Sequence, residues 1–385
     1  MSEIKVNSIK GVGASAAAIT VNNTDGTCTA NITNKPNRNL IINGAMQVAQ
    51  RGTSSTTSGI HTVDRIGCDF GGADENPTQE QVDVAAGTTP YSLGFRKAFK
   101  ITNGNQTSGA GASDYVRTAY KIEAQDVANS GWNYTSSSSN ITLSFWVKSS
   151  VSKDFNFLIH TTDGTGKLYP MTTGTLSADT WTKVTKTIPG LSNLTFDNNN
   201  GSGIIFQIYQ YLGTTYTAGS VTNNQWQNYS PTEQTPDQSS AWWTTNDATF
   251  ELTGVQLEVG SVATDFEHRS FAQEIQSCYR YYYHIKDSQL FGGRAASGGG
   301  RAKWTMMTPV PLRASPTIDT SPFGDTWSAT GYKYNGVSTS TTVPTINEYL
   351  QNSCHICFSQ LGHSLDDDRN FTWQANVDLA LDAEL

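Results

Sequence analysis

The chain has 385 residues, only 15% of them charged, and a formal net charge of −8 at pH 7. This length can hold two or more domains of roughly 150 residues each. The acidic balance, without a Lys/Arg cluster, argues against nucleic acid as a partner. No run approaches the roughly 18 apolar residues of a membrane helix, so we expect no membrane insertion. The many Gly, Ser, Thr and Asn residues, with 10% aromatics, are typical of short strands joined by turns.

Residues 1–38 carry only a weak alternation of apolar residues, interrupted by glycines such as Gly11 and Gly26. A segment of this kind cannot bury a core of its own. We therefore expect a partner chain or a larger assembly to order it, and a frayed terminus is the alternative.

From residue 39 onward the pattern is that of β-strands. In residues 141–148 every second side chain is apolar, which predicts a half-buried strand with one face formed by Ile141, Leu143, Phe145 and Val147. Residues 155–159 repeat this alternation, and residues 204–211 are apolar on both faces, which predicts a deeper strand. No helical period separates the strands, so residues 39–269 are predicted to form a two-sheet antiparallel sandwich.

The last strand of this region changes phase at Thr253 and Gly254. Apolar residues fall on one set of alternate positions before this point and on the other set after it: Phe250 and Leu252, then Val255, Leu257 and Val259. A one-residue slip at a glycine predicts a β-bulge, which bends the strand and restores its inward face.

Residues 270–286 are predicted to form a helical linker. Over residues 270–282 the apolar side chains recur at spacings of four, three and four: Phe271, Ile275, Cys278 and Tyr282. Ser270 and Gln273 have the spacing of a capping box, which predicts the start of the helix. The stripe either packs on the sandwich or forms a seam with copies from other subunits.

Residues 287–385 are predicted to form a second, smaller β-domain. The predicted fold is therefore mainly β: a jelly-roll sandwich, a short helix and this smaller domain. Its first part contains Pro309, Pro311 and Pro316, which restrict it to edges and turns. Residues 371–382 alternate between apolar and polar side chains and are predicted to form one core strand, so trimming this end should be destructive.

Several stretches resemble a family found in tail-fibre and tail-associated proteins of bacteriophages. The stretches are 39–52 (NLIINGAMQVAQRG), 61–66 (HTVDRI), 141–148 (ITLSFWVK), 250–261 (FELTGVQLEVGS), 266–269 (FEHR), 274–282 (EIQSCYRYY) and 381–385 (LDAEL). The first two resemble the opening of the family's central domain, and the next three resemble its core strand and its exit. The resemblance covers residues 39–282 well and the rest thinly.

The resemblance implies a phage virion protein, either a tail fibre or a host receptor-binding subunit. It also implies a homotrimer that attaches to other tail or virion proteins through residues 1–38, is made in the host cytoplasm and is not secreted. The central domain resembles the jelly-roll sandwich of carbohydrate-binding modules, which often hold calcium where the bulged last strand turns. The matching Thr253 and Gly254 supply no carboxylate, which lowers the expectation of calcium, and no cofactor is predicted.

Four aromatic residues in the polar stretch 223–246 are the candidate ligand-binding residues: Trp226, Tyr229, Trp242 and Trp243. Sugars bind by laying a C–H face on an aromatic ring while nearby amides and carboxylates hold the hydroxyl groups. This chemistry predicts a host surface glycan or lipopolysaccharide as the ligand. The alternative is that the tryptophans anchor a long loop or lie at a subunit interface.

No metal site is predicted. Cys354 and Cys357, with His355 and His363, have a metal-like spacing, but a closed zinc site usually takes four ligands from two separated pairs, and a plain strand is the alternative. The acidic run 366–368 suits either a hard cation or a solvated turn between strands.

No catalytic motif accompanies this architecture. The chain has no G-x-S-x-G nucleophile motif, nothing that fixes a pair of carboxylates in one cleft, and no long repeat of the kind found in β-helical depolymerases. The leading hypothesis is therefore a non-enzymatic phage virion protein that adheres to cell-surface glycan. The alternatives are a purely structural tail- or capsid-decorating protein without receptor binding, and a glycan depolymerase.

Overall fold

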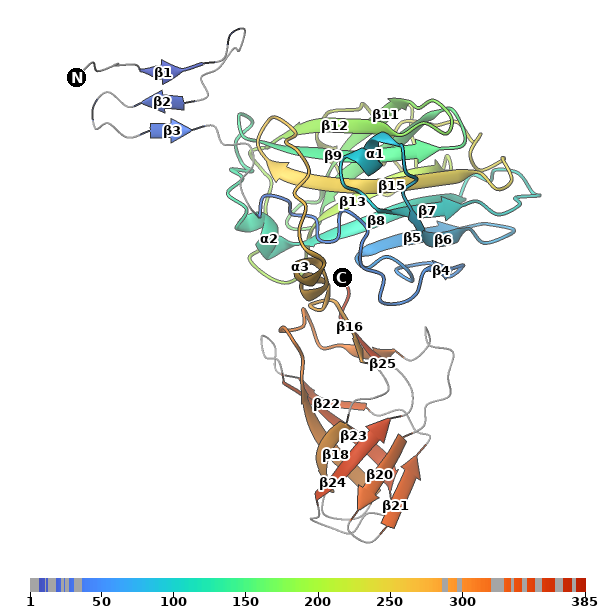
Figure 1. Ribbon diagram of the computed structural model, residues 1–385. Helices are drawn as coiled ribbons and strands as arrows, with labels where there is room; N and C mark the ends of the chain where they lie inside the picture. Colours follow the sequence, from blue (N-terminus) through green and yellow to red (C-terminus); the bar gives the residue numbers. More distant parts are fainter. Residues whose placement is uncertain are drawn as a thin grey trace.

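The fold is mainly β and combines a sandwich, a short helix and further sheets (Figure 1), as the sequence predicts. The computed structural model describes residues 37–285 without a gap and, outside that range, residues 7–10, 12, 19–21, 24, 28–30, 290–295, 300–319, 329–333, 336–340, 345–349, 355–363, 370–375 and 379–385.

Two six-stranded sheets form the sandwich, and every pairing within them is antiparallel. The first sheet has the order β14 (Gln227–Asn228), β11 (Lys167–Thr175), β10 (Asp154–Thr161), β13 (Ser202–Leu212), β8 (Tyr115–Glu123), β5 (Ile66–Gly71). The second has the order β12 (Thr182–Pro189), β9 (Asn140–Ser149), β15 (Thr249–Val259), β7 (Lys97–Thr102), β6 (Thr78–Asp83), β4 (Ser54–Ser55). Two short helices, α1 (Thr89–Ser92) and α2 (Ala124–Ala128), lie between strands. This arrangement is the predicted jelly-roll sandwich.

The sandwich core lies between the two sheets. The alternate apolar residues of β9 and β10 are fully buried there: Ile141, Leu143, Phe145, Val147, Phe155, Phe157 and Ile159. The Phe145 and Phe157 rings meet edge to face across the sheets, with centroids 5.3 Å apart. The alternation in the sequence therefore assigns the inward faces of both strands correctly.

The predicted bulge is present in β15. The pairing of β15 with β9 shifts between Thr253 and Gln256, and Gly254 has a φ of +64°. A Cβ atom at Gly254 would lie 2.6 Å from Cζ of Phe95, which is closer than side-chain carbons approach. Only glycine fits this bend, because both the backbone conformation and the space exclude a side chain.

Replacing Gly254 with alanine should therefore lower the free energy of unfolding by about 2–4 kcal/mol, the sum of left-handed backbone strain and overpacking. Urea titration measures the change. Gly87 has a similar φ of +85° and no atom within 4 Å of the added Cβ, so Gly87→Ala is the matched control and should cost only about 1–2 kcal/mol. Equal losses in the two variants would show that the contact with Phe95 contributes nothing.

The linker helix α3 (Phe271–Cys278) begins at the predicted cap. Ser270 accepts a hydrogen bond from the Gln273 backbone N–H, and the Gln273 side chain accepts one from the Ser270 N–H. The helix ends before Tyr282, which instead begins strand β16. Of the predicted stripe, Cys278 is buried against the sandwich, whereas Phe271 is 54% exposed. The inward face of α3 is thus set by Glu274 and Cys278, and a seam with copies from other subunits stays a prediction.

The N-terminal segment forms a separate three-stranded sheet of β1 (Ser8–Ile9), β2 (Ile19–Val21) and β3 (Cys28–Ala30). The sheet stands apart from the sandwich (Figure 1). Ile9 is 54% exposed. Strands of two or three residues with exposed apolar side chains do not make a stable sheet alone, so a partner that orders residues 1–38 stays a prediction.

Beyond α3 the chain forms two sheets. The smaller one has the order β16 (Tyr282–Ile285), β25 (Leu379–Asp382), β19 (Thr317–Asp319). The larger has seven strands in the order β21 (Gly336–Ser340), β20 (Ala329–Lys333), β24 (Asn370–Ala375), β17 (Leu290–Ala295), β18 (Gly300–Met307), β23 (His355–His363), β22 (Thr345–Tyr349). The prediction of one strand over residues 371–382 was wrong, because β24 and β25 belong to different sheets, although the alternation runs through both.

The C-terminal residues lie against the sandwich. Ala380, Leu381 and Ala383 are buried. The Glu384 carboxylate pairs with the buried guanidinium of Arg65, and the Arg313 side chain donates to the backbone oxygens of Ala383 and Glu384. The last strand and the residues after it thus connect the small sheet to the sandwich.

Candidate functional site

The outer face of the first sandwich sheet carries a row of side chains that point away from the core. Each residue pairs directly with the next across the strands, so all of them point to the same side: Gln227, Leu168, His160, Ile205 and Lys121. At about 4.8 Å per strand the row is roughly 19 Å long. We call this surface, together with Tyr229, the outer sheet face.

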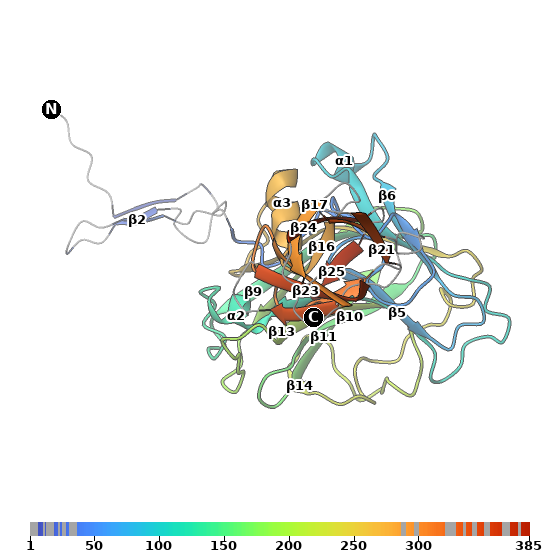
Figure 2. The ribbon, with the colours of Figure 1, turned by 90° about the horizontal axis from the view of Figure 1, so that it is seen from below.

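Tyr229 and His160 form an aromatic platform at one end of the outer sheet face. Their rings are stacked, with centroids 4.1 Å apart and planes inclined by 12°. Tyr229 is 42% exposed, so the ring side that does not meet His160 is open to solvent. Burial lowers the pKa of His160 to about 4, so the imidazole is neutral at pH 5–8 and stacks without charge. In Figure 2, β14, which leads into Tyr229, lies clear of the C-terminal strands.

A loop of residues 230–238, which follows Tyr229, covers the adjoining part of the same face. Tyr209, fully buried below it, has its hydroxyl 2.8 Å from Oε1 of Gln207 and 2.7 Å from Oε1 of Gln234 in the loop. The Asn156 side chain donates to the backbone oxygen of Pro236 at 2.8 Å. The loop therefore closes part of the sheet and leaves the row from His160 to Lys121 less covered.

The other end of the row opens into a cavity of about 290 Å³. The lining residues come mainly from β5, β8, residues 59–61 and the C-terminal end: Arg51, Gly59, Ile60, His61, Arg65, Gly67, Asp69, Ala119, Lys121, Asp382, Glu384 and Leu385. Burial lowers the pKa of Lys121, and its ammonium donates to the Leu385 backbone oxygen. The outer sheet face thus combines an aromatic platform, the partly buried Ile205 and a polar cavity, whereas Leu168 of the same row is completely buried.

Three of the four predicted binding residues are anchors in the structure. Trp242 and Trp243 are 0% and 1% exposed, and their indole N–H groups donate to the backbone oxygens of Thr249 and Gly109. Neither ring has an exposed face, which corrects the prediction that these two contact a ligand. Trp226 is half-buried, and its indole N–H donates to Pro189 at 2.7 Å. The alternative, that the tryptophans anchor a long loop, describes all three.

Tyr229 is the member of the predicted set that has the exposure needed for binding. The structure adds His160, Ile205 and Lys121, which the sequence reasoning did not include. Alternation offered one signal, because in β10 His160 lies on the face opposite to Phe155, Phe157 and Ile159. The pairing of distant strands, which brings His160 beside Ile205 and Lys121, has no local signal in the sequence.

Neither metal hypothesis can be placed on the described side chains. Cys354 and the acidic run 366–368 lie outside the described residues, and the side chains of β23, with His355 and Cys357, are not described. Among the residues that the structure does describe, no group of three or more His, Cys, Asp or Glu side chains could hold a metal ion. Within the same residues, no helix is long and apolar enough to cross a membrane.

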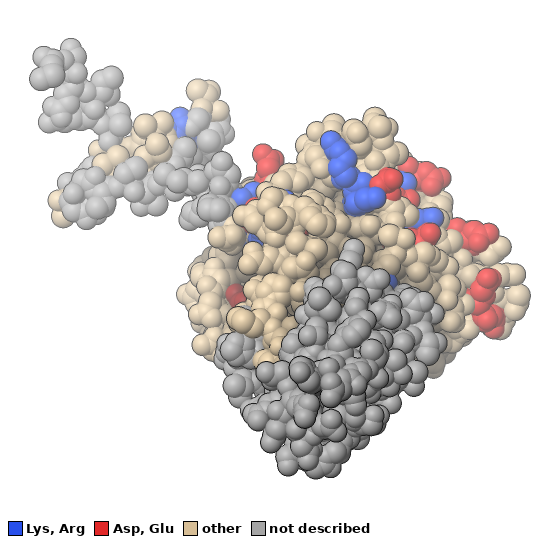
Figure 3. Space-filling model, turned by 60° about the horizontal axis from the view of Figure 1, so that its bottom comes forward, with Lys and Arg blue, Asp and Glu red and all other residues tan. Residues whose placement is uncertain are grey.

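The visible surface is sparsely charged. Figure 3 shows its described part as mostly uncharged residues, with basic and acidic side chains in small separate groups. The described part of this face shows no large basic patch of the kind that nucleic acid requires.

No protein-family model and no curated protein matches the chain. Among solved structures it is similar to the enzymatically active domain of tailspike protein 4 of bacteriophage CBA120 (10% identity, 59% of this chain and 22% of that chain, TM-score 0.31). It is also similar to a family 11 carbohydrate-binding module from Clostridium thermocellum (12%, 55% and 98%, TM-score 0.25) and to the CBM22-1–GH10 modules of xylanase 10B from Clostridium thermocellum (10%, 65% and 34%, TM-score 0.28). Because these TM-scores are below 0.5, the fold assignment rests on the strand order of the chain itself.

Proposed function

We propose that this chain is a non-enzymatic adhesive subunit of a bacteriophage particle that binds cell-surface glycan through the outer sheet face. The observation that carries the proposal is the Tyr229 ring, exposed on one side and supported on the other by the neutral ring of His160. A supported ring binds a sugar face at a low entropic cost because it is already held in place.

Two features support a virion location. Residues 39–282 resemble a family of phage tail proteins, and the N-terminal strands are too short to form a stable sheet without a partner. In this proposal residues 1–38 attach the subunit to other tail or virion proteins, and the assembled form is a homotrimer.

The carboxylates that line the cavity are each paired with an arginine. Asp69 pairs with Arg117 at 3.1 Å, Asp382 pairs with Arg51 at 3.3 Å, and Glu384 pairs with Arg65. Carboxylates held in place by guanidinium groups are suited to accept hydrogen bonds from sugar hydroxyls.

Replacing Tyr229 with alanine should weaken binding to host cell-surface glycan. The loss of ring contact is worth about 1–2 kcal/mol, which corresponds to a roughly five- to thirtyfold higher Kd. Binding of the purified full-length chain to immobilised host polysaccharide measures it. Phe271→Ala removes another exposed aromatic side chain, on α3, and is the matched control that should leave the Kd unchanged.

Competition with the phage separates the proposal from its alternatives. Excess purified chain should block phage adsorption, and the Tyr229→Ala variant should block it poorly. A chain that binds no host polysaccharide and leaves adsorption unaffected would instead be a purely structural decorating protein. Release of reducing sugar from host polysaccharide would assign it as a depolymerase.

A further inference from the structure

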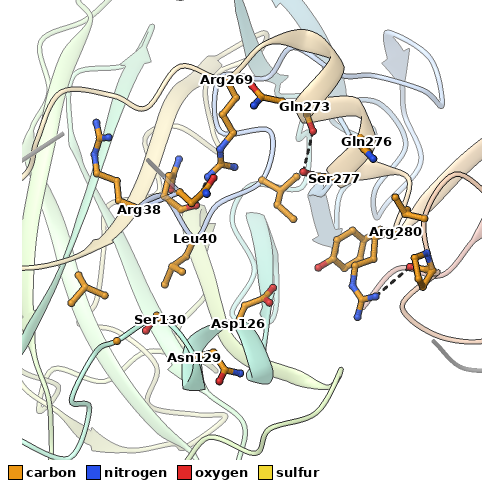
Figure 4. A pocket seen from close by; sticks show the side chains of 18 residues that line it. Arg38, Leu40, Asp126, Asn129, Ser130, Arg269, Gln273, Gln276, Ser277 and Arg280 are labelled. Atoms are coloured by element: carbon orange, nitrogen blue, oxygen red, sulfur yellow. Dashed lines mark hydrogen bonds between the residues drawn. The ribbon is translucent and has the colours of Figure 1, made fainter. Parts of the chain in front are cut away.

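A groove of about 1040 Å³ lies where the sandwich, helix α3 and the C-terminal region meet (Figure 4). Asp126, Asn129 and Ser130, at and just beyond helix α2, lie across the groove from Gln276 and Ser277 of α3. None of its lining residues belongs to the outer sheet face or to the cavity at the end of that face. The groove is therefore a second, independent concave surface.

Guanidinium groups dominate the charge on the groove wall. Arg38, Arg269 and Arg280 line it, and Asp126 is the one acidic lining residue. The arginines do have carboxylate partners, which are Glu258 for Arg38, Glu267 and Glu274 for Arg269, and Glu123 for Arg280. None of these glutamates lines the groove, so a ligand inside it meets the guanidinium groups at closer range than the carboxylates.

Two side chains on opposite walls of the groove have unused hydrogen-bonding capacity. Among the described residues, no hydrogen bond or ion pair engages the side chains of Asp126 and Gln276, which are both exposed to the groove. These two exposed side chains can exchange hydrogen bonds with a ligand in the groove.

We propose that this groove binds an anionic saccharide, a polyhydroxylated ligand that carries carboxylate groups. The carboxylates of the ligand accept hydrogen bonds from the Nη1 groups of Arg269 and Arg280, because Nε and Nη2 of Arg280 are engaged by Glu123. Hydroxyl groups of the same ligand donate to Asp126 and exchange hydrogen bonds with the Gln276 amide. The volume is at the upper end of the range of small-molecule sites, so it accommodates several sugar units.

The combination of groups favours a saccharide over an acidic peptide. Arginine donors and the Asp126 carboxylate line the same groove, and a ligand must satisfy both. A uronic acid unit has hydroxyl donors directly beside its carboxylate. A run of acidic peptide side chains supplies negative charge but few donors for Asp126, which would repel it.

Replacing Asp126 with asparagine should tighten binding of the anionic saccharide. The change removes the negative charge from the groove wall and keeps an acceptor oxygen, and Asp126 is exposed, so folding should be unaffected. With tetragalacturonate as the probe and full-length protein, calorimetry should show a Kd lower by roughly three- to fivefold, an effect that shrinks in high salt. Binding of neutral maltotetraose should not tighten.

Two substitutions on α3, each of which adds a negative charge, test the proposal in the opposite direction. Gln276→Glu places a negative charge on the groove wall and should weaken tetragalacturonate binding by a similar factor. Ala272→Glu adds the same charge at an exposed position of the same helix that does not line the groove, and should leave binding nearly unchanged. Equal effects of the two variants would mean that only the net charge of the protein matters.

Several results would overturn the proposal. They are no measurable binding of tetragalacturonate at millimolar concentration, no gain from Asp126→Asn, or equally tight binding of tetraglutamate, which would assign the groove to acidic peptides. The Tyr229→Ala variant should bind tetragalacturonate like the unchanged protein. This last comparison separates failure at the groove from failure of the glycan-binding proposal for the outer sheet face.

Discussion

Replacing Arg65 with methionine should lower the free energy of unfolding by about 3–5 kcal/mol, which is the usual loss when one partner of a buried ion pair is removed. Arg65 is 2% exposed and pairs with Glu384, and its guanidinium carbon lies 3.4 Å from the ring centroid of Tyr281. Without Arg65 the Glu384 carboxylate keeps only Arg51, at 3.5 Å. Chemical denaturation followed by circular dichroism measures the loss.

Arg96 provides the matched control for Arg65. Its guanidinium carbon lies 3.9 Å from the ring centroid of Tyr91, but the side chain is exposed, so Arg96→Met should cost less than about 1 kcal/mol. The double variant Arg65→Met/Glu384→Gln should recover part of the loss, because it removes the unpaired carboxylate. If the double variant is as unstable as the sum of its two single variants, the pair is not coupled.

Replacing Trp242 with alanine should lower the free energy of unfolding by about 3–5 kcal/mol, which is the usual loss when a large buried aromatic side chain is removed and a cavity is left. Trp242 is completely buried in the sandwich core, and its indole N–H donates to the Thr249 backbone oxygen at 3.2 Å. The substitution removes the packing and one of the two donors to that oxygen, which keeps the Ser150 backbone N–H. The midpoint of urea unfolding should fall accordingly.

Trp181 is the control for Trp242, because it is half-buried and packs at the edge of a smaller cluster. Trp181→Ala should lower the free energy of unfolding by less than half as much as Trp242→Ala does. Glycan binding by folded Trp242→Ala protein should match that of the unchanged chain, since this ring has no exposed face. A selective loss of binding, with stability preserved, would restore Trp242 as a ligand contact.

Structural features that depend on a few consecutive residues were predictable from the sequence. The alternation over residues 141–148 fixes the buried face of β9, the phase slip at Gly254 marks a bulge, and Ser270 with Gln273 marks the start of α3. In each case a single strand, turn or helix end decides the outcome. The physical requirement therefore lies within a few consecutive residues.

Features that depend on distant pairing were not predictable. Trp242 and Trp243 lie in a polar stretch, and nothing local shows that the core of the sandwich accepts both rings. The continuous alternation over residues 371–382 gives no sign that β24 and β25 join different sheets. Likewise, His160 meets Tyr229 only because β14 pairs at the edge of the first sheet. Strand order is a property of the whole chain.

The order of the C-terminal strands has a mechanical consequence. The backbone passes between the small sheet and the seven-stranded sheet four times: from β16 to β17, from β18 to β19, from β19 to β20, and from β24 to β25. A single proteolytic cut in any one of these connections leaves the other three intact. The seven-stranded sheet therefore stays tethered after a nick, and a pulling force on it is shared among several covalent connections.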